Sequence, residues 1–195
     1  MKKGFTLLEL LIVIGIMAVL ATAATIVLNP AQLLAQARDS QRISDMDALK
    51  AAISLYLTDV TTPSLGACST AAGTKGRTFT ADPTDGSFAG PVGADITGTR
   101  VTTGAGWVDV NFSGISGGSP LAVLPIDPKN TGNTVYRYAC NQTNRTFELN
   151  ACLESSKYIS KMGEDGGDKP ASGASTACEI IGATSFYEVG TVLTL

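Results

Sequence analysis

The hydrophobic positions of this chain follow two patterns, an unbroken run and then a periodic stripe. Between Phe5 and Ala37 the only charged side chain is Glu9, and Leu10 to Leu28 are almost all apolar. About 20 apolar residues in a helix cross the ~30 Å hydrocarbon core of a bilayer. The run therefore predicts a membrane-spanning helix with one acid near its start.

Beyond Asn29-Pro30, apolar residues recur at the spacing of one helix face. This stripe contains Ile43, Met46, Leu49, Ile53, Tyr56 or Leu57, and Val60. The intervening charged residues predict a solvated face, with Asp39 and Arg42 as an i,i+3 ion pair. Pro30 should kink the helix, because proline removes a backbone hydrogen bond. We predict one continuous, kinked helix from about Phe5 to Asp59.

The rest of the chain gives strand signals. Residues 61–130 are rich in Gly and Thr, with one predicted strand at 107–112 and an extended passage, LPIDP, within 121–128. A hairpin is predicted from 135–140 and 146–152 around a turn at 141–144, and a last strand at 187–195.

Side-chain parity assigns the two faces of the predicted hairpin. The face expected to cover the helix stripe carries Val135, Ala139, Phe147, Leu149, Ala151 and Leu153, and the other face carries Tyr136, Tyr138, Glu148 and Asn150. The predicted fold class is α+β. A long kinked N-terminal helix, with a transmembrane half and an amphipathic half, packs against a small antiparallel β-sheet.

Composition narrows the function. The chain has no histidine, which removes the commonest general base and metal ligand, so an enzyme is not expected. The net charge is −3 and no basic cluster follows Lys2-Lys3, so no nucleic-acid partner is indicated. Lys2 and Lys3 indicate instead a cytoplasmic N-terminus, by the positive-inside rule.

The N-terminal segment KKGFTLLELLIVIGIMAVLATAA resembles the class III leader and first helix of type IV pilins and of type II secretion pseudopilins. The resemblance implies cleavage by prepilin peptidase after Gly4, methylation of the new N-terminus at Phe5, and an assembly role for Glu9. In the family this acid meets the amine of a neighbouring subunit, which we favour here, and pairing with the amine of the same chain is the alternative that the sequence leaves open. The passages LPIDP, YRY and FEL look more loosely like the sheet of a major pseudopilin.

This resemblance implies a non-enzymatic structural subunit that polymerises with identical subunits into a helical filament. Its expected partners are prepilin peptidase, membrane lipid and the assembly machinery of a bacterial inner membrane. The expected regions are a leader at 1–4, a transmembrane and polymerisation helix at 5–28, an amphipathic helix at 29–60 and an exported head at 61–195. We favour a major pseudopilin of type II-like protein secretion.

Other interpretations of the sequence stay open. A true type IV pilin would serve adhesion, motility or DNA uptake, and a membrane-tethered binding module would never polymerise. Ala21-Thr22-Ala23 could pass for the cleavage site of an ordinary signal peptide, but such leaders have a shorter apolar core without an acid.

An acidic loop is a candidate calcium site. Glu164, Asp165 and Asp168 supply carboxylates among glycines, which suits a hard cation with oxygen ligands. Major pseudopilins have a calcium site in their C-terminal loop, so the resemblance favours this interpretation. The alternative is an ordinary solvated turn.

Four cysteines, Cys68, Cys140, Cys152 and Cys178, all follow the membrane segment, which indicates disulfides. The predicted hairpin separates Cys140 from Cys152 by roughly 20 Å along the strands, too far for a bond. We favour Cys68–Cys140 with Cys152–Cys178. The pairing Cys68–Cys152 with Cys140–Cys178 is the alternative.

Overall fold

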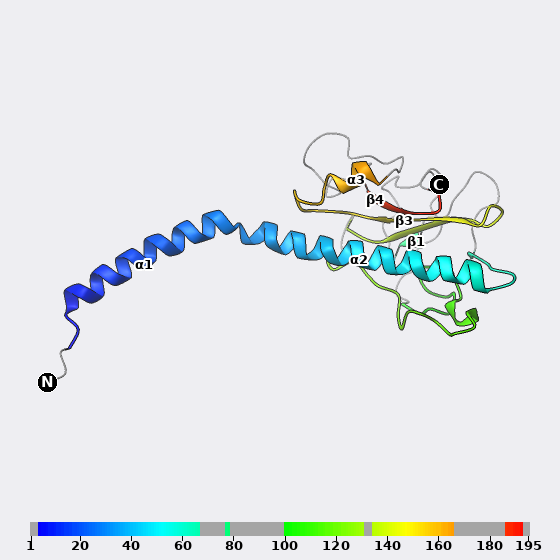
Figure 1. Cartoon of the computed structure of the whole chain (residues 1–195), viewed down its shortest axis with the longest axis horizontal. Coiled ribbons are helices and arrows are strands. Elements are labelled where there is room, and N and C mark those ends of the chain that lie inside the picture. Colours follow the sequence, from blue (N-terminus) through cyan, green and yellow to red (C-terminus); the bar gives the residue numbers. More distant parts are fainter. Residues whose placement is uncertain (1–3, 67–76, 79–99, 131–133, 166–185, 193–195) are drawn as a thin grey trace. The chain divides into compact units, whose positions relative to one another are not determined.

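The computed structural model describes residues 4–66, 77–78, 100–130, 134–165 and 186–192. The chain divides into two compact units, Met1–Ala35 and Gln36–Leu195. The predicted α+β class is confirmed, since helices dominate the first part of the chain and an antiparallel sheet lies in the second (Figure 1).

The first part of the chain forms two helices where one was predicted. Helix α1 covers Leu7–Leu28 and helix α2 covers Pro30–Asp59. Asn29 between them has a left-handed backbone, with φ 38° and ψ 77°. The predicted end of the helix at Asp59 is confirmed. The interruption predicted at Asn29-Pro30 is confirmed too, but it divides the helix completely, because a left-handed residue ends a right-handed helix.

The sheet of the second unit has four antiparallel strands in the order β1-β2-β3-β4. Strand β1 covers Arg77–Thr78, β2 Arg137–Asn141, β3 Thr146–Ala151 and β4 Tyr187–Gly190. A 3-10 helix, η1, covers Phe112–Gly114, and the short helix α3 covers Lys161–Glu164. Helix α2 lies along one face of this sheet (Figure 1).

The predicted hairpin exists, but its register is shifted by one residue. Cys140 pairs with Phe147, and Asn141 pairs with Thr146, so the turn covers residues 142–145 instead of the predicted 141–144. Arg145, the last residue of this turn, has a positive φ of 55°. A one-residue shift moves the side chains of one strand to the other face.

The shift corrects the assignment of the two faces of the hairpin. Tyr136, Tyr138 and Cys140 share the core with the helix stripe, together with Phe147, Leu149 and Ala151. Ala139 instead lies opposite Glu148 and therefore on the far face. The predicted core positions in β3 were right, and those in β2 were wrong.

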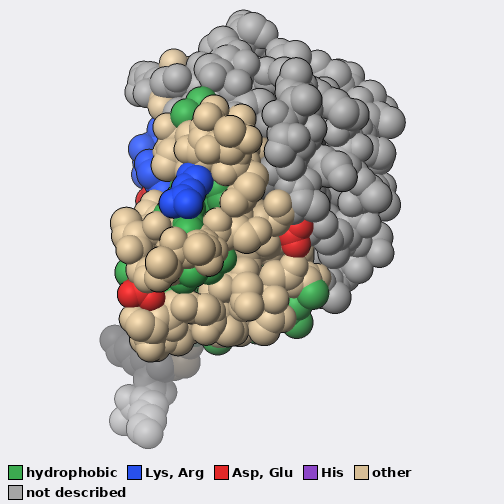
Figure 2. Space-filling model, turned by 90° about the vertical axis from the view of Figure 1, so that its right-hand side faces the viewer, with side chains coloured by type: hydrophobic (Ala, Val, Ile, Leu, Met, Phe, Trp, Pro, Cys, Tyr) green, Lys and Arg blue, Asp and Glu red, His purple; other side chains and the backbone are tan. Residues whose placement is uncertain are grey.

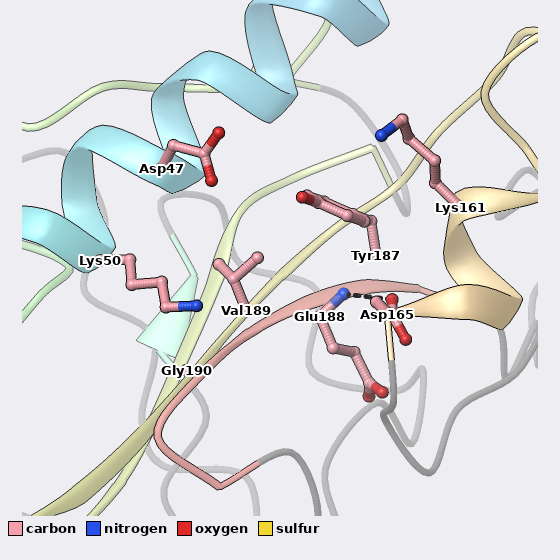
Figure 3. Close-up of a pocket in the computed structure, with 8 residues that line it drawn as sticks. All are labelled: Asp47, Lys50, Lys161, Asp165, Tyr187, Glu188, Val189 and Gly190. Atoms are coloured by element: carbon pink, nitrogen blue, oxygen red, sulfur yellow. Dashed lines mark hydrogen bonds between the residues drawn. The ribbon is translucent and has the colours of Figure 1, made fainter.

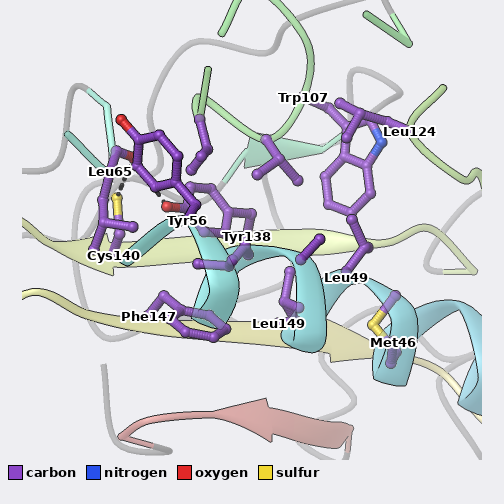
Figure 4. Close-up of a cluster of buried hydrophobic side chains, with 14 of the residues drawn as sticks. Met46, Leu49, Tyr56, Leu65, Trp107, Leu124, Tyr138, Cys140, Phe147 and Leu149 are labelled. Carbon is purple, nitrogen blue, oxygen red and sulfur yellow. Dashed lines mark hydrogen bonds between the residues drawn. The ribbon is translucent and has the colours of Figure 1, made fainter. Parts of the chain in front are cut away.

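Helix α2 and the sheet enclose one large hydrophobic cluster (Figure 4). Met46, Leu49 and Ile53 of the predicted stripe are fully buried in it. Trp107 also belongs to this cluster and is fully buried, and its indole N–H donates to the Pro125 carbonyl at 2.9 Å. The stripe predicted from the sequence is therefore the helix side of this core.

Two other predicted strands need correction. Residues 107–112 are not a strand: Trp107, Val108, Val110 and Phe112 are buried in an irregular segment that runs into η1. The last strand ends at Gly190, and positions 193–195 of the prediction lie outside the described residues. Gly190 is required there, because a Cβ atom would collide with the Phe147 carbonyl of the neighbouring strand.

Candidate functional site

The residues expected to be cleaved and methylated lie in an open segment ahead of α1. Gly4 has no neighbouring atom within 4 Å of the place where a Cβ would stand. Phe5 is 81% exposed. Both residues have extended or irregular backbone, so a protease could bind the chain here without unfolding a helix.

The start of α1 is a capping box formed by Thr6 and Glu9. The Thr6 hydroxyl accepts from the Glu9 N–H at 3.2 Å. In return, the Glu9 Oε2 accepts from the Thr6 N–H at 2.9 Å and from its hydroxyl at 2.8 Å. The two side chains therefore satisfy each other's backbone donors at the helix end.

Sequence reasoning singled out Glu9 but missed Thr6. The signal was present, since a Thr followed three residues later by a Glu before an apolar run is the pattern of a capping box. Thr6 gives the carboxylate two neutral donors within its own chain. Glu9 is thus held at the tip of α1, where the helix dipole also favours a negative charge.

The surface of α1 is apolar on every side. All side chains from Leu7 to Thr25 are exposed, and this span has a mean hydropathy of 2.5. The span is long and apolar enough to cross a membrane. A helix that is apolar all round requires an apolar environment, which can be lipid or other helices.

A buried ion cluster fixes α2 to the loops of the second unit. The Arg42 guanidinium, which is fully buried, donates to Asp127 at 2.6 and 2.9 Å and to Asp39 at 2.9 Å. It also lies 2.6 Å from a carboxylate oxygen of Glu154. The predicted Asp39–Arg42 pair is therefore confirmed as a pair, but its predicted position on a solvated face is wrong.

The charges of this cluster perturb one another's protonation. Burial by itself would raise the pKa of Glu154, but hydrogen bonds from Arg38 and the charge of Arg42 hold that pKa at about 2. Burial would lower the pKa of Arg42, and its bonds to Asp127 and Glu154 raise it instead. Glu154 is thus ionised at neutral pH beside the Arg42 cation. The cluster works as a clamp, since Asp39 also accepts from the N–H groups of Glu154 and Ser155.

The acidic loop is only partly described. Asp165 is half-buried, and its Oδ2 accepts from the Glu188 N–H at 2.8 Å. The side chain of Glu164 and all of Asp168 lie outside the described residues. Within the described part of the chain no three acidic, His or Cys side chains form a metal-binding group. The calcium site therefore stays a prediction.

A cavity of about 320 Å³ lies between α2, α3 and β4 (Figure 3). Its lining is Asp47, Lys50, Lys161, Asp165, Tyr187, Glu188, Val189 and Gly190. Cations and acids are mixed in this lining. Burial raises the pKa of Tyr187, and the nearby Asp47 and Asp165 raise it further, so its hydroxyl stays protonated.

Two of the four cysteines lie in the described residues. Cys140 and Cys152 are both disulfide-bonded. The register pairs Cys140 with Phe147, which leaves Cys152 five positions further along β3 and its continuation. They are therefore too far apart to bond each other. Cys68 and Cys178 lie outside the described residues.

The surroundings of the two cysteines differ. The Cys140 Sγ lies 3.2 Å from the carbonyl oxygen of Leu65, three residues before Cys68. Cys152 belongs to a second cluster with Leu153, Met162 and Phe186, ahead of β4. These contacts place Cys140 beside the segment that leads to Cys68, and Cys152 beside the segment that follows Cys178.

Residues 1–25 match a family model described as the prokaryotic N-terminal methylation motif. The match covers the leader and most of α1, and it indicates a class III prepilin leader, as in type IV pilins and pseudopilins. It supports a pilin-like or pseudopilin-like subunit anchored in a membrane. No curated protein and no solved structure matches the chain.

Proposed function

We propose that this protein is a non-enzymatic structural subunit of a pilus or pseudopilus filament. The main support is that the methylation motif includes a helix that is apolar on every side and exposed along Leu7–Thr25. Before assembly, lipid covers this helix. In the filament, the same surface packs against the helices of identical subunits, where burial of apolar area stabilises the fibre.

Processing supplies the charge that directs assembly. Prepilin peptidase cuts after Gly4, and the amine of Phe5 is methylated and stays cationic. In the free subunit, Glu9 accepts from the N–H and hydroxyl of Thr6. A neighbour's amine would replace these neutral donors by an ionised one, which forms a stronger hydrogen bond with a carboxylate. Glu9 thereby selects the correct axial position of the incoming subunit.

The remaining assignments follow from this arrangement. Residues 1–4 are the leader, 5–28 the transmembrane and polymerisation helix, 29–60 the amphipathic helix, and 61–195 the exported head. Lys2 and Lys3 keep the N-terminus on the cytoplasmic side of a bacterial inner membrane. The filament serves type II-like protein secretion, a choice supported by the LPIDP passage, whose Asp127 is an acceptor in the buried clamp.

Two features of the head belong to this proposal. Cys68 pairs with Cys140 and Cys152 with Cys178, which agrees with the contacts of Cys140 and Cys152. Glu164, Asp165 and Asp168 hold calcium as oxygen ligands. The Asp165 carboxylate lies beside β4, where its Oδ2 accepts from the Glu188 N–H.

The proposal is tested by substitutions at the cleavage and assembly residues. Gly4→Leu should leave the leader uncut, because a bulky side chain crowds the protease site. Glu9→Val should be cut and inserted normally, since it makes α1 more apolar, yet it should form few filaments. Normal filament yield from Glu9→Val would refute the pairing, and a cut Gly4→Leu chain would refute the leader assignment.

A further inference from the structure

The cavity between α2, α3 and β4 has no part in the proposed filament role. Its volume of about 320 Å³ is at the small end of the range for small-molecule sites, roughly 300–1,000 Å³. All of its lining residues belong to the second unit of the chain, and they come from α2, from β4, and from α3 with the residue that follows it. The cavity is therefore a feature of the folded head alone.

The floor of the cavity is formed by β4. Side chains alternate along a strand, so Tyr187 and Val189 point to the helix side of the sheet, whereas the Glu188 side chain points away from the cavity (Figure 3). Val189 is buried in the main hydrophobic cluster, and Tyr187 packs against it. Gly190 has no side chain and presents its backbone to the cavity. The floor is thus held in place by the core.

Charged side chains of both signs form a rim around this floor. Asp47 and Lys50 come from α2, and Lys161 of α3 lies across the cavity from them (Figure 3). Asp165 completes the charged rim, but its Oδ2 is already bonded to the Glu188 N–H. Within the described part of the chain, the side chains of Asp47, Lys50 and Lys161 form no ion pair or hydrogen bond. These three charges are therefore available to a ligand.

The charged rim favours a ligand that itself carries both signs. A simple anion would be attracted by the two lysines but repelled by the two aspartates, and a simple cation would meet the reverse. A molecule with a carboxylate and an ammonium group makes charge-assisted hydrogen bonds to both kinds of side chain.

We propose that this cavity binds a small zwitterion, an amino acid or a dipeptide. Its carboxylate pairs with Lys50 and Lys161, and its ammonium group pairs with Asp47. The apolar part of the ligand lies on Val189 and on the ring of Tyr187. This binding does not depend on the filament role of the chain.

A nuclear magnetic resonance titration of the full chain in detergent micelles tests the ligand class, with EDTA present to remove calcium. Dialanine, a dipeptide with both charges, should shift the amide signals of Val189 and Gly190 to saturation. N-acetyl-dialanine keeps only the carboxylate, and dialanine amide keeps only the ammonium group. Each should bind about fivefold more weakly, because one exposed charge pair is lost. Equal binding of either blocked dipeptide, or no saturable shift with dialanine, would overturn the proposal.

Substitution of the two lysines tests the location of the site. Lys50→Met and Lys161→Met remove one charge each at exposed positions, so the fold should persist, which the thermal midpoint checks. Each variant should bind dialanine about fivefold more weakly than the original chain. Lys157→Met is the matched control, since Lys157 is exposed on the same segment as Lys161 but does not line the cavity. Unchanged affinity in either cavity variant, or an equal loss in the control, would overturn this location.

Discussion

Glu9 carries the only charged side chain of α1, and its bonds with Thr6 explain how the free subunit holds this carboxylate. Moving an unpaired carboxylate into hydrocarbon is costly. The capping box lowers this cost by giving Glu9 two donors from Thr6 at 2.8 and 2.9 Å. These donors are neutral, so a cation can compete for the carboxylate during assembly.

Thr6→Ala should weaken the start of α1 by about 1 kcal/mol, because it removes the cap of the first turn. The N-terminal amides should then exchange faster with solvent in micelles, and filament yield should fall. Thr6→Ser keeps the hydroxyl and is the matched control. Equal exchange rates in the alanine and serine variants would show that the capping box does not hold Glu9.

Arg42 is the central cation of the buried clamp. Arg42→Ala would leave Asp39, Asp127 and Glu154 close together without their buried cation. Removing one partner of a buried ion pair costs about 3–5 kcal/mol, and urea unfolding of the full chain in micelles measures this. Arg38→Ala, at a partly exposed pair, should cost about 1 kcal/mol or less. Similar losses for both variants would contradict the clamp.

The lowered pKa of Glu154 predicts that the head loses stability in acid. Its pKa lies at about 2 in the folded chain, below its ordinary value of 4.5. A depressed pKa stabilises the fold fully above the ordinary value, and this contribution is lost as the pH falls from about 4.5 towards 2. The thermal midpoint should therefore drop in this window. Glu154→Gln should flatten that part of the pH profile, and an unchanged profile would exclude Glu154 as its source.

Among the elements, the hairpin shows what local sequence can and cannot determine. Both strands and the turn were predicted from alternation and from Asn-rich turn residues. The register was missed because the turn lies at 142–145, one residue later than predicted, and ends at Arg145, a residue without special turn preference that adopts a positive φ. Packing decides that choice, since the observed register places Tyr136 and Tyr138 in the core.

The disulfides follow from the same register. Non-reducing peptide mapping should find Cys68 joined to Cys140 and Cys152 joined to Cys178. This result is expected because Cys140 lies beside Leu65, whereas Cys152 lies beside Phe186. A peptide joining Cys140 to Cys152 would contradict the register itself, and the crossed pairs would contradict the assignment of the two segments.

The sequence points to the candidate site more directly than to the buried clamp. Gly4, Phe5 and Glu9 are singled out because they form a short motif at the start of a long apolar run. Arg42, Asp127 and Glu154 lie far apart in sequence, and nothing local indicates that α2 buries its charged side against the LPIDP loop. The prediction of a strand at 107–112 was wrong for a related reason. Trp107 and Val108 are adjacent and both buried, so tertiary packing, and not alternation along the chain, determines their burial.

At the scale of the whole molecule, the two units have opposite surfaces. All side chains along Leu7–Thr25 are exposed, and this span is almost entirely apolar. On the face drawn in Figure 2, the described surface has only scattered hydrophobic and charged side chains among backbone and other side chains. A chain of this kind can assemble through its helix while its head remains in water, which is the arrangement that a filament subunit needs.

The most direct test of the filament proposal is mass spectrometry of the N-terminal peptide of subunits recovered from sedimented filaments. We predict filaments visible by electron microscopy, built of chains that begin at methylated Phe5. Material that sediments only as membrane, with chains that still begin at Met1, would contradict it.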